Sequence, residues 1–94
     1  MNERLTLDCV ICKSSDVIQA KLDDEIVLMS PERGKYYGLD SVGTVIWSRL
    51  EEPITIADLI DRLLEKYDVD SAECEIDTLE FLNSIKSEGL IRKV

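Results

Sequence analysis

The feature that most constrains the fold of this chain is a change in hydrophobic spacing at Asp40. Before this residue, the segments 17–21 and 25–30 are aliphatic with partial alternation of apolar and polar residues, as in half-buried β-strands. After it, apolar residues recur at the three- to four-residue spacing of amphipathic helices. A chain of 94 residues can build one core but not two. The sequence therefore predicts a single α+β domain over residues 1–94.

Turn-forming residues separate the predicted strands. The pair Asp23-Asp24 suits a tight turn after the first strand, and the segment 30–34, with Pro31 and Gly34, suits a second turn. The short aromatic segment 35–39 then forms a third strand. We expect a three-stranded antiparallel meander over 16–39, preceded by an N-terminal arm or extra strand within 1–15.

Three helices are predicted in the remaining part of the chain, 40–94. Each predicted helix starts at residues whose side chains can accept hydrogen bonds from the free amides of a first turn. These candidate caps are Asp40 or Ser41, Thr55, and Asp70 or Ser71. Gly89 can adopt the left-handed conformation that ends the third helix, after which Leu90 folds back. Gly43 costs about 1 kcal/mol inside a helix relative to Ala, so we expect it to admit another backbone at close range.

The third predicted helix is apolar over an arc wider than a single neighbour requires. The stripe expected to pack on the domain contains Ile76, Leu79, Leu82 and Ile85. A second stripe, rotated sideways, contains Cys74, Thr78, Phe81 and Ile85, with Asp77 on its border. This pattern indicates two hydrophobic neighbours, of which one is the domain and the other a candidate ligand.

Charge and residue inventory exclude two classes of function. Twenty acidic residues against eleven basic ones give a net charge of −9, which favours cationic or neutral partners and weighs against nucleic acid. The sequence has no His and no glycine-rich phosphate loop, and its acidic pairs lie in turns or on polar helix faces. We therefore expect neither DNA binding nor catalysis, and no cofactor.

The three cysteines leave an alternative open. Cys9 and Cys12 have the CxxC spacing of metal and redox sites, but zinc needs four ligands and the chain adds one more cysteine, Cys74. A structural role is the simpler interpretation, with a thiol- or metal-binding protein as the rival. The chain lacks an apolar run of the ~20 residues that span a bilayer and the features of a signal peptide, so we expect a cytoplasmic protein.

The pair Tyr36-Tyr37 has two interpretations. Strand alternation places one ring in the core and the other on the polar face. Alternatively, the third strand is a sheet edge to which an extended peptide can add, with backbone groups supplying affinity and side-chain pockets supplying specificity. The residue pattern alone leaves both interpretations open.

The order of motifs resembles a known family. Ile26-Val27-Leu28-Met29 precedes a turn and the run from Gly34 through Tyr36-Tyr37-Gly38-Leu39 to Trp47, and Tyr67-Asp68-Val69, Asp77 to Leu82 and Gly89-Leu90-Ile91 follow. Over about residues 17–92 the chain resembles the PqqD-like family. Its members are the recognition elements of ribosomally synthesised and post-translationally modified peptides (RiPPs). The discrete leader-binding proteins of lasso peptide biosynthesis are the most similar in length and pattern.

The resemblance implies a winged-helix-like fold and a non-catalytic peptide chaperone. A precursor's leader peptide would add beside the third strand and lie against the third helix. The implied edge is Lys35, Tyr36, Tyr37, Gly38 and Leu39; the implied facing wall is Cys74, Asp77, Thr78, Phe81 and Ile85; Val27 and Met29 would floor pockets for apolar leader side chains. Asp40, where the family more often has Asn, alters a helix cap.

The resemblance also implies the partners. In lasso peptide systems such a protein presents the precursor to a separate leader peptidase, a cysteine protease, before a cyclase closes the ring. The chain itself would be a monomer or weak dimer without nucleic-acid or membrane partners. The main alternative is delivery of a precursor to another maturation enzyme, such as a radical SAM enzyme.

Overall fold

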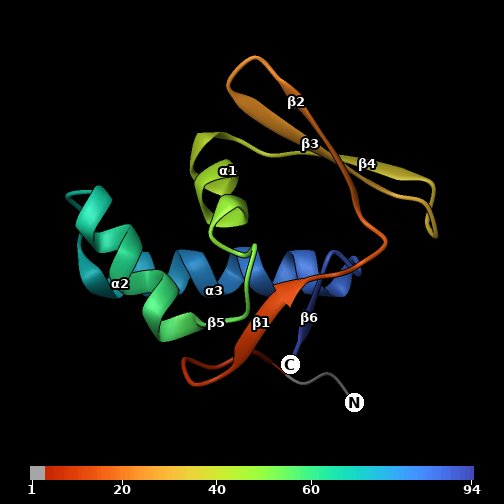
Figure 1. Cartoon of the computed structure of the whole chain (residues 1–94). Coiled ribbons are helices and arrows are strands. Elements are labelled where there is room, and N and C mark those ends of the chain that lie inside the picture. The colour runs from red at the N-terminus through yellow and green to blue at the C-terminus, as the bar shows by residue number, and fades with distance from the viewer. Residues whose placement is uncertain (1–3) are drawn as a thin grey trace.

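A computed structural model, which describes residues 4–94, contains two small sheets and three helices (Figure 1). The elements are β1 (Val10–Lys13), β2 (Ile18–Leu22), β3 (Glu25–Ser30), β4 (Lys35–Gly38), α1 (Ser41–Ser48), β5 (Ile54–Thr55), α2 (Ile56–Lys66), α3 (Ser71–Ser87) and β6 (Ile91–Lys93). The expected α+β order, a three-stranded antiparallel sheet followed by three helices, is confirmed. None of the helices in this described part is both long and apolar enough to cross a membrane.

The meander forms a sheet with strand order β2-β3-β4, so β4 is an edge strand. Leu28 in the central strand lies opposite Gln19 and Tyr37, and it is fully buried. Because side chains alternate along strands, these three residues define the inner face of the sheet, which packs on α1 and the core. Val27 and Met29 point to the opposite, outer face.

A second sheet, with order β5-β1-β6, was not fully predicted. The expected N-terminal arm or extra strand contains β1, which pairs antiparallel with both β5 and β6. Strands β5 and β6 have two and three residues, too few for an alternating pattern to be visible in the sequence. Ile11 of β1 is completely buried, so this sheet seals the end of the core opposite the meander (Figure 1).

The helix ends follow the predicted capping chemistry. Asp40, Thr55 and Asp70 each accept a hydrogen bond from a first-turn amide, and Gly89 ends α3 with φ +78°. The backbone N–H of the buried Leu90 then donates to the carbonyl of Ile85. These bonds satisfy backbone groups that the helix itself leaves without partners.

Gly43 serves a different purpose from the one expected. We predicted close approach of another backbone, but a Cβ at this position would lie 3.2 Å from the carboxylate of Asp40 and 3.3 Å from the ring of Phe81. The approaching groups are side chains: the capping carboxylate of α1 and an aromatic ring of α3. Gly43 therefore allows α1 and α3 to meet through Phe81.

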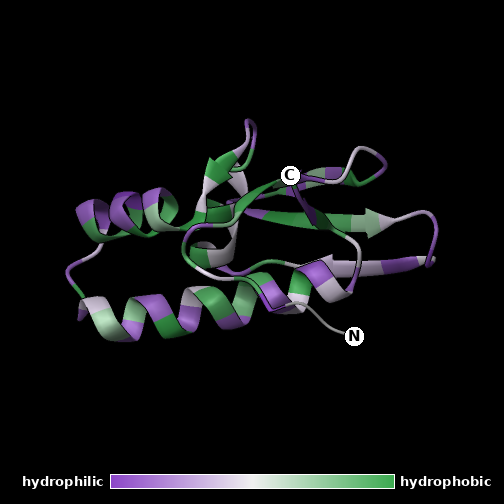
Figure 2. Cartoon of the chain, turned by 90° about the horizontal axis from the view of Figure 1, so that it is seen from below, coloured by the Kyte–Doolittle hydropathy of each residue, from purple (hydrophilic) through white to green (hydrophobic). Residues whose placement is uncertain are grey.

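The core lies between the two sheets and the three helices, and α2 and α3 run beside each other along one side of it (Figure 2). Trp47 is buried, and its indole N–H donates to Gln19 Oε1 at 2.9 Å. One prediction for α3 is wrong: Ile76 is 55% exposed rather than packed on the domain. The helix is rotated so that Thr78, Leu82 and Ile85 form its buried side.

Candidate functional site

The free side of β4 carries backbone groups suited to bind an extended peptide. The N–H of Leu39 donates to the carbonyl of Ile26. This bond determines which residues of β4 hydrogen-bond to β3. Because bonded and non-bonded positions alternate in antiparallel pairs, Lys35 and Tyr37 face β3 with their backbone groups. The N–H and C=O groups of Tyr36 and Gly38 therefore point away from the sheet, where another strand can pair.

Tyr37 of β4 and Arg33 in the turn before this strand fix the strand to the end of α3. The Tyr37 hydroxyl donates to Glu88 Oε1 at 2.5 Å, and Arg33 Nη2 donates to the carbonyl of Ser87 at 3.0 Å. The hydrogen bond from Tyr37 lowers the pKa of the Glu88 carboxyl, with smaller contributions from nearby cations. The same bond raises the pKa of the Tyr37 hydroxyl. These contacts hold the edge strand at a defined position relative to the helix.

Two adjoining cavities lie beyond the other end of β4, between α1 and α3. The smaller, about 190 Å³, is lined by Asp40, Val42, Gly43, Ile46, Asp77, Thr78 and Phe81. The larger, about 320 Å³, is lined by Val42, Leu63, Tyr67, Val69, Glu73, Cys74, Asp77 and Thr78. They share Val42, Asp77 and Thr78, so they form one continuous depression from Asp40 to the α2–α3 connection.

The chemistry of this depression suits an apolar side chain with a positive or neutral neighbour. Its floor and walls are mainly aliphatic and aromatic, and the acidic residues that border it are Asp40, Glu73 and Asp77. Neither Lys nor Arg is among its lining residues. The carboxylate of Asp40 is already engaged as the cap of α1, since it accepts from the Gly43 N–H at 2.7 Å. Glu73 and Asp77 are therefore the groups that a basic ligand residue can meet.

Comparison with known proteins assigns the chain to a family. The family model described as coenzyme PQQ synthesis protein D (PqqD) matches residues 25–91, which include the meander from β3 onward and all three helices. The chain belongs to the PqqD family.

Two curated relatives carry the name PqqA binding protein. The one from Xanthomonas axonopodis pv. citri (strain 306) is 28% identical over 74 residues, which are 79% of this chain and 78% of the relative. The one from Xanthomonas euvesicatoria pv. vesicatoria (strain 85-10) is 29% identical over 69 residues, 73% of each protein.

Two solved structures share the fold of this PqqD family member. TbiB1 in complex with the TbiA(beta) leader peptide superposes with a TM-score of 0.80 at 37% identity, covering 86% of this chain and 94% of TbiB1. A lasso peptide synthetase B1 complexed with the leader peptide gives a TM-score of 0.77 at 24% identity, covering 87% and 96% of the two chains. The second likeness shows a common fold only.

The structure divides the sequence-predicted residues of this PqqD-like chain into three groups. Lys35, Tyr36, Tyr37 and Gly38 form the β4 edge, and Cys74, Asp77, Thr78 and Phe81 line the depression. Leu39 and Ile85 are buried in the core and line neither cavity. Val27 and Met29 lie on the outer face of the sheet, where Val27 is directly opposite Gly38.

Sequence reasoning missed several residues that line the depression: Asp40, Val42, Ile46, Leu63, Tyr67, Val69 and Glu73. Val42 shares the helical spacing of Val45 and Ile46, which is typical of a core position, but its side chain is 44% exposed. Helical periodicity reports that a residue faces a neighbour without telling whether the neighbour is the core or a cavity beside it. An apolar residue in the first turn of α1, directly after the edge strand, is the one signal that pointed here.

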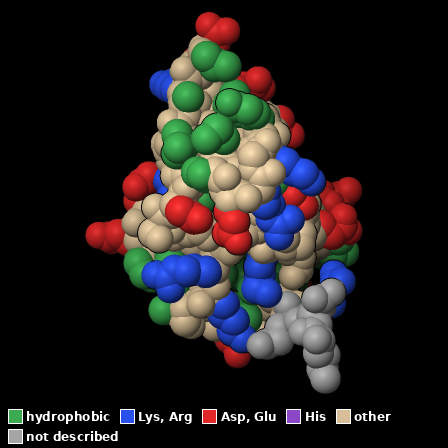
Figure 3. Space-filling model, turned by 90° about the vertical axis from the view of Figure 1, so that its right-hand side faces the viewer, with side chains coloured by type: hydrophobic (Ala, Val, Ile, Leu, Met, Phe, Trp, Pro, Cys, Tyr) green, Lys and Arg blue, Asp and Glu red, His purple; other side chains and the backbone are tan. Residues whose placement is uncertain are grey.

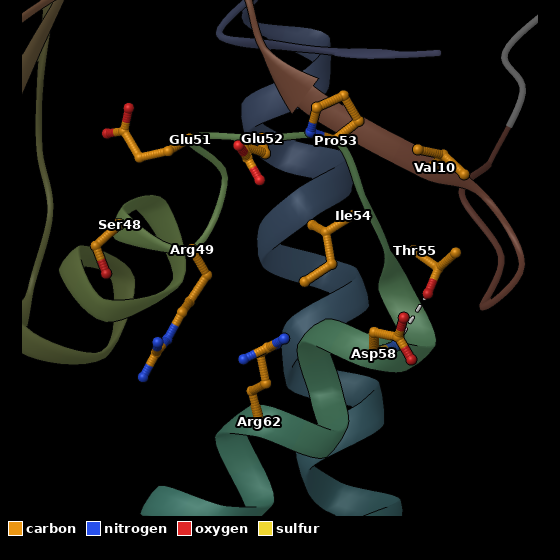
Figure 4. Close-up of a pocket in the computed structure, with 10 residues that line it drawn as sticks. All are labelled: Val10, Ser48, Arg49, Glu51, Glu52, Pro53, Ile54, Thr55, Asp58 and Arg62. Atoms are coloured by element: carbon orange, nitrogen blue, oxygen red, sulfur yellow. Dashed lines mark hydrogen bonds between the residues drawn. The ribbon is translucent and has the colours of Figure 1, made fainter.

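A larger cavity of the PqqD-like chain lies elsewhere. It has a volume of about 630 Å³ between the end of α1, β5 and the start of α2, and it contains none of the predicted peptide-binding residues (Figure 4). Arg49, directly after α1, and Arg62 of α2 point into it, and Glu52 and Asp58 also border it. Its mixed charges and open shape lack the apolar anchor that the α1–α3 depression offers.

All three cysteines are free thiols in the structure. Cys9 and Cys12 are buried at the β1 sheet, and Cys74 is half-buried on α3. The Thr6 hydroxyl, followed by the Thr6 backbone, lowers the pKa of the Cys9 thiol through hydrogen bonding. Within residues 4–94, no cluster of three or more potential metal ligands is present.

Proposed function

We propose that this chain is a non-catalytic RiPP recognition element that binds the leader of a lasso peptide precursor as an added strand on β4. The observation that carries the proposal is the free edge at Tyr36 and Gly38, which leads directly into an apolar depression between α1 and α3. Backbone pairing supplies affinity without regard to sequence, and the depression supplies selectivity. The match to the PqqD family and the similarity to TbiB1, whose structure contains a leader peptide, support the same function.

The direction of β4 relates the parts of the ligand to the parts of the site. A peptide that pairs antiparallel to β4 runs from the Leu39 end towards the Lys35 end. Residues that precede its paired segment therefore reach the depression, where an apolar side chain can be buried among Val42, Thr78 and Phe81. A basic residue beside that anchor would meet Asp77.

The paired segment itself has two faces because side chains alternate along a strand. Inward side chains lie next to Tyr37, and outward ones lie next to Tyr36 and Gly38. At Gly38 the outer face has a notch: no atom lies within 4 Å of a Cβ built there, and its backbone is not left-handed. An outward leader side chain can enter this notch and contact Val27. In this arrangement Val27 would serve as a pocket floor, the role that the family resemblance implies for Val27 and Met29.

The proposed role is presentation of substrate. By holding the leader, the chain raises the local concentration of the precursor at a separate leader peptidase, and a cyclase acts afterwards. The catalytic groups belong to those enzymes.

A second candidate is delivery of a different precursor to another maturation enzyme. It is favoured by the curated relatives, whose name states that they bind PqqA. The β4 edge and the depression would serve in the same way, and only the ligand would differ.

Titration of ¹⁵N-labelled protein with synthetic leader peptides tests both candidates. Saturable shifts centred on β4 and on the α3 residues Asp77 to Phe81, with a lasso leader but not with PqqA, support the main proposal. The reverse preference supports the second. Unchanged spectra with every leader would refute the peptide-binding function.

A further inference from the structure

The outer face of the β2–β3–β4 sheet is apolar although it is open to solvent. The apolar side chains that it presents are Ile18, Ala20, Leu22, Val27, Met29 and Tyr36. Ile18, Leu22 and Tyr36 are 53%, 61% and 73% exposed. Figure 3 shows hydrophobic side chains gathered in the upper part of the molecule, over this sheet. A solvated sheet face normally carries polar residues, and an exposed apolar patch of this kind marks an interaction surface.

The notch at Gly38 interrupts this face next to the proposed peptide edge. Gly38 pairs with Val27, so the missing side chain leaves one flank of Val27 uncovered. Neither a positive φ nor internal crowding requires glycine at this position. A peptide strand on β4 would place an outward side chain beside the notch and extend the apolar face by one strand. The surface is therefore larger and more continuous when the peptide is bound.

We propose that this completed outer face is the surface by which the chain docks onto the enzyme that processes its bound peptide. The inference rests on the proposed function, because the face is continuous with the peptide-binding edge. A processing enzyme that contacts both the sheet and the outward leader side chains would bind the leader-bound (loaded) chain more tightly than the leader-free (empty) chain.

Charge identifies the chemistry of the partner surface. The turn between β2 and β3 carries Asp23 and Asp24, whereas the turn between β3 and β4 carries Glu32 beside Arg33. Figure 3 shows acidic side chains above the hydrophobic cluster. The complementary surface is an apolar patch with Lys or Arg where it faces the β2–β3 turn. A second copy of this chain fits poorly, because it would bring the same acidic β2–β3 turn and a net charge of −9.

The loaded and empty states should differ measurably in affinity for the enzyme. Burial of about half of one large apolar side chain against the enzyme contributes ~1 kcal/mol, which corresponds to about a fivefold difference in Kd. This linkage also requires the enzyme to tighten leader binding by the same factor.

The test uses the double variant Ile18→Thr with Leu22→Thr, both on β2 at the sheet edge remote from β4. Threonine suits a strand, so the fold should be retained, and leader affinity should stay within about twofold of wild type. Ile76→Gln, a similarly exposed position on α3, is the matched control. The measurements are leader affinity, affinity for the separate leader peptidase of the proposed function, and the rate of leader removal at low peptidase concentration.

We expect the double variant to reduce the rate of leader removal by about tenfold or more while the control variant leaves it unchanged. Full activity of the double variant would overturn the docking surface and leave the peptide-binding function intact. Failure of the wild type to bind the leader would instead refute the proposed function. If light scattering shows that the wild type is a dimer and the double variant a monomer, the outer face mediates self-association and the docking proposal is wrong.

Discussion

Substitution of Gly38 by Val separates the two roles that β4 is proposed to have. The Gly38 site is open, its φ is not positive, and the position lies in a strand. A β-branched residue there should therefore stabilise the fold by up to ~1 kcal/mol, since glycine pays the largest conformational entropy in a strand. For a domain of this size, 1 kcal/mol corresponds to a rise in Tm of about 4–8 °C.

The same substitution should weaken leader binding. Valine fills the notch over Val27, so the outward leader side chain loses a contact that buries about half of its surface, or ~1–1.5 kcal/mol. Backbone pairing stays possible because the side chain projects to one face of the strand. The expected change is a five- to tenfold increase in Kd, on the scale of about 1.4 kcal/mol per tenfold.

Thermal unfolding and calorimetric titration with the leader measure the two effects on one sample. A leader with Ala at the outward position should bind wild type and Gly38→Val about equally, which makes the loss specific to the notch. Undiminished affinity of Gly38→Val for the natural leader would refute the reasoning about the notch. Unfolding of the variant would refute the reasoning about the open site.

Three further predictions concern the surroundings of the edge. Phe81→Ala, which removes a half-buried ring from the wall of the depression, should weaken leader binding by about tenfold or more while the variant stays folded, as affinity measurement with circular dichroism would show. Tyr37→Phe removes the hydrogen bond that lowers the pKa of Glu88, so that pKa should rise in an NMR titration. The wild type gains stability from this pair above the ordinary pKa of a glutamate and loses it as pH falls through the lowered value, so the stability difference from Tyr37→Phe should vanish in acid. Thr55→Ala removes the cap of α2 and should cost ~1 kcal/mol in urea unfolding, without changing leader affinity.

The parts of the fold that sequence could predict are those set by local chemistry. The meander was visible because its turns carry Asp23-Asp24 and Pro31 with Gly34, and helix ends were visible because capping residues act within one turn. Strands β5 and β6 were not, because their pairing with β1 joins residues far apart in the chain. A two-residue strand has no pattern of its own, and only tertiary contact defines it.

The candidate site was predictable to the extent that the position of a residue in a strand or helix sets the direction of its side chain. The alternation of β4 predicted that one of Tyr36 and Tyr37 is exposed, and the second stripe of α3 indicated that Cys74 and Phe81 face a ligand. The rotation of α3 was not predictable, because its apolar arc is broad enough to allow several orientations; the structure buries Thr78 and Ile85 and exposes Ile76. Packing of Phe81 against Gly43 helps to fix the orientation, and it depends on a contact 38 residues away.

Strand addition at the free edge of β4 is tested most directly by amide hydrogen exchange with and without the leader peptide. The amides of Tyr36 and Gly38 point away from β3, so they should exchange rapidly in the free protein and become protected in the complex. The amides of Tyr37 and Leu39, already bonded to β3, should change little. Protection that appears instead along β2, the other edge of the sheet, or no protection at Tyr36 and Gly38 under saturating leader, would contradict the account.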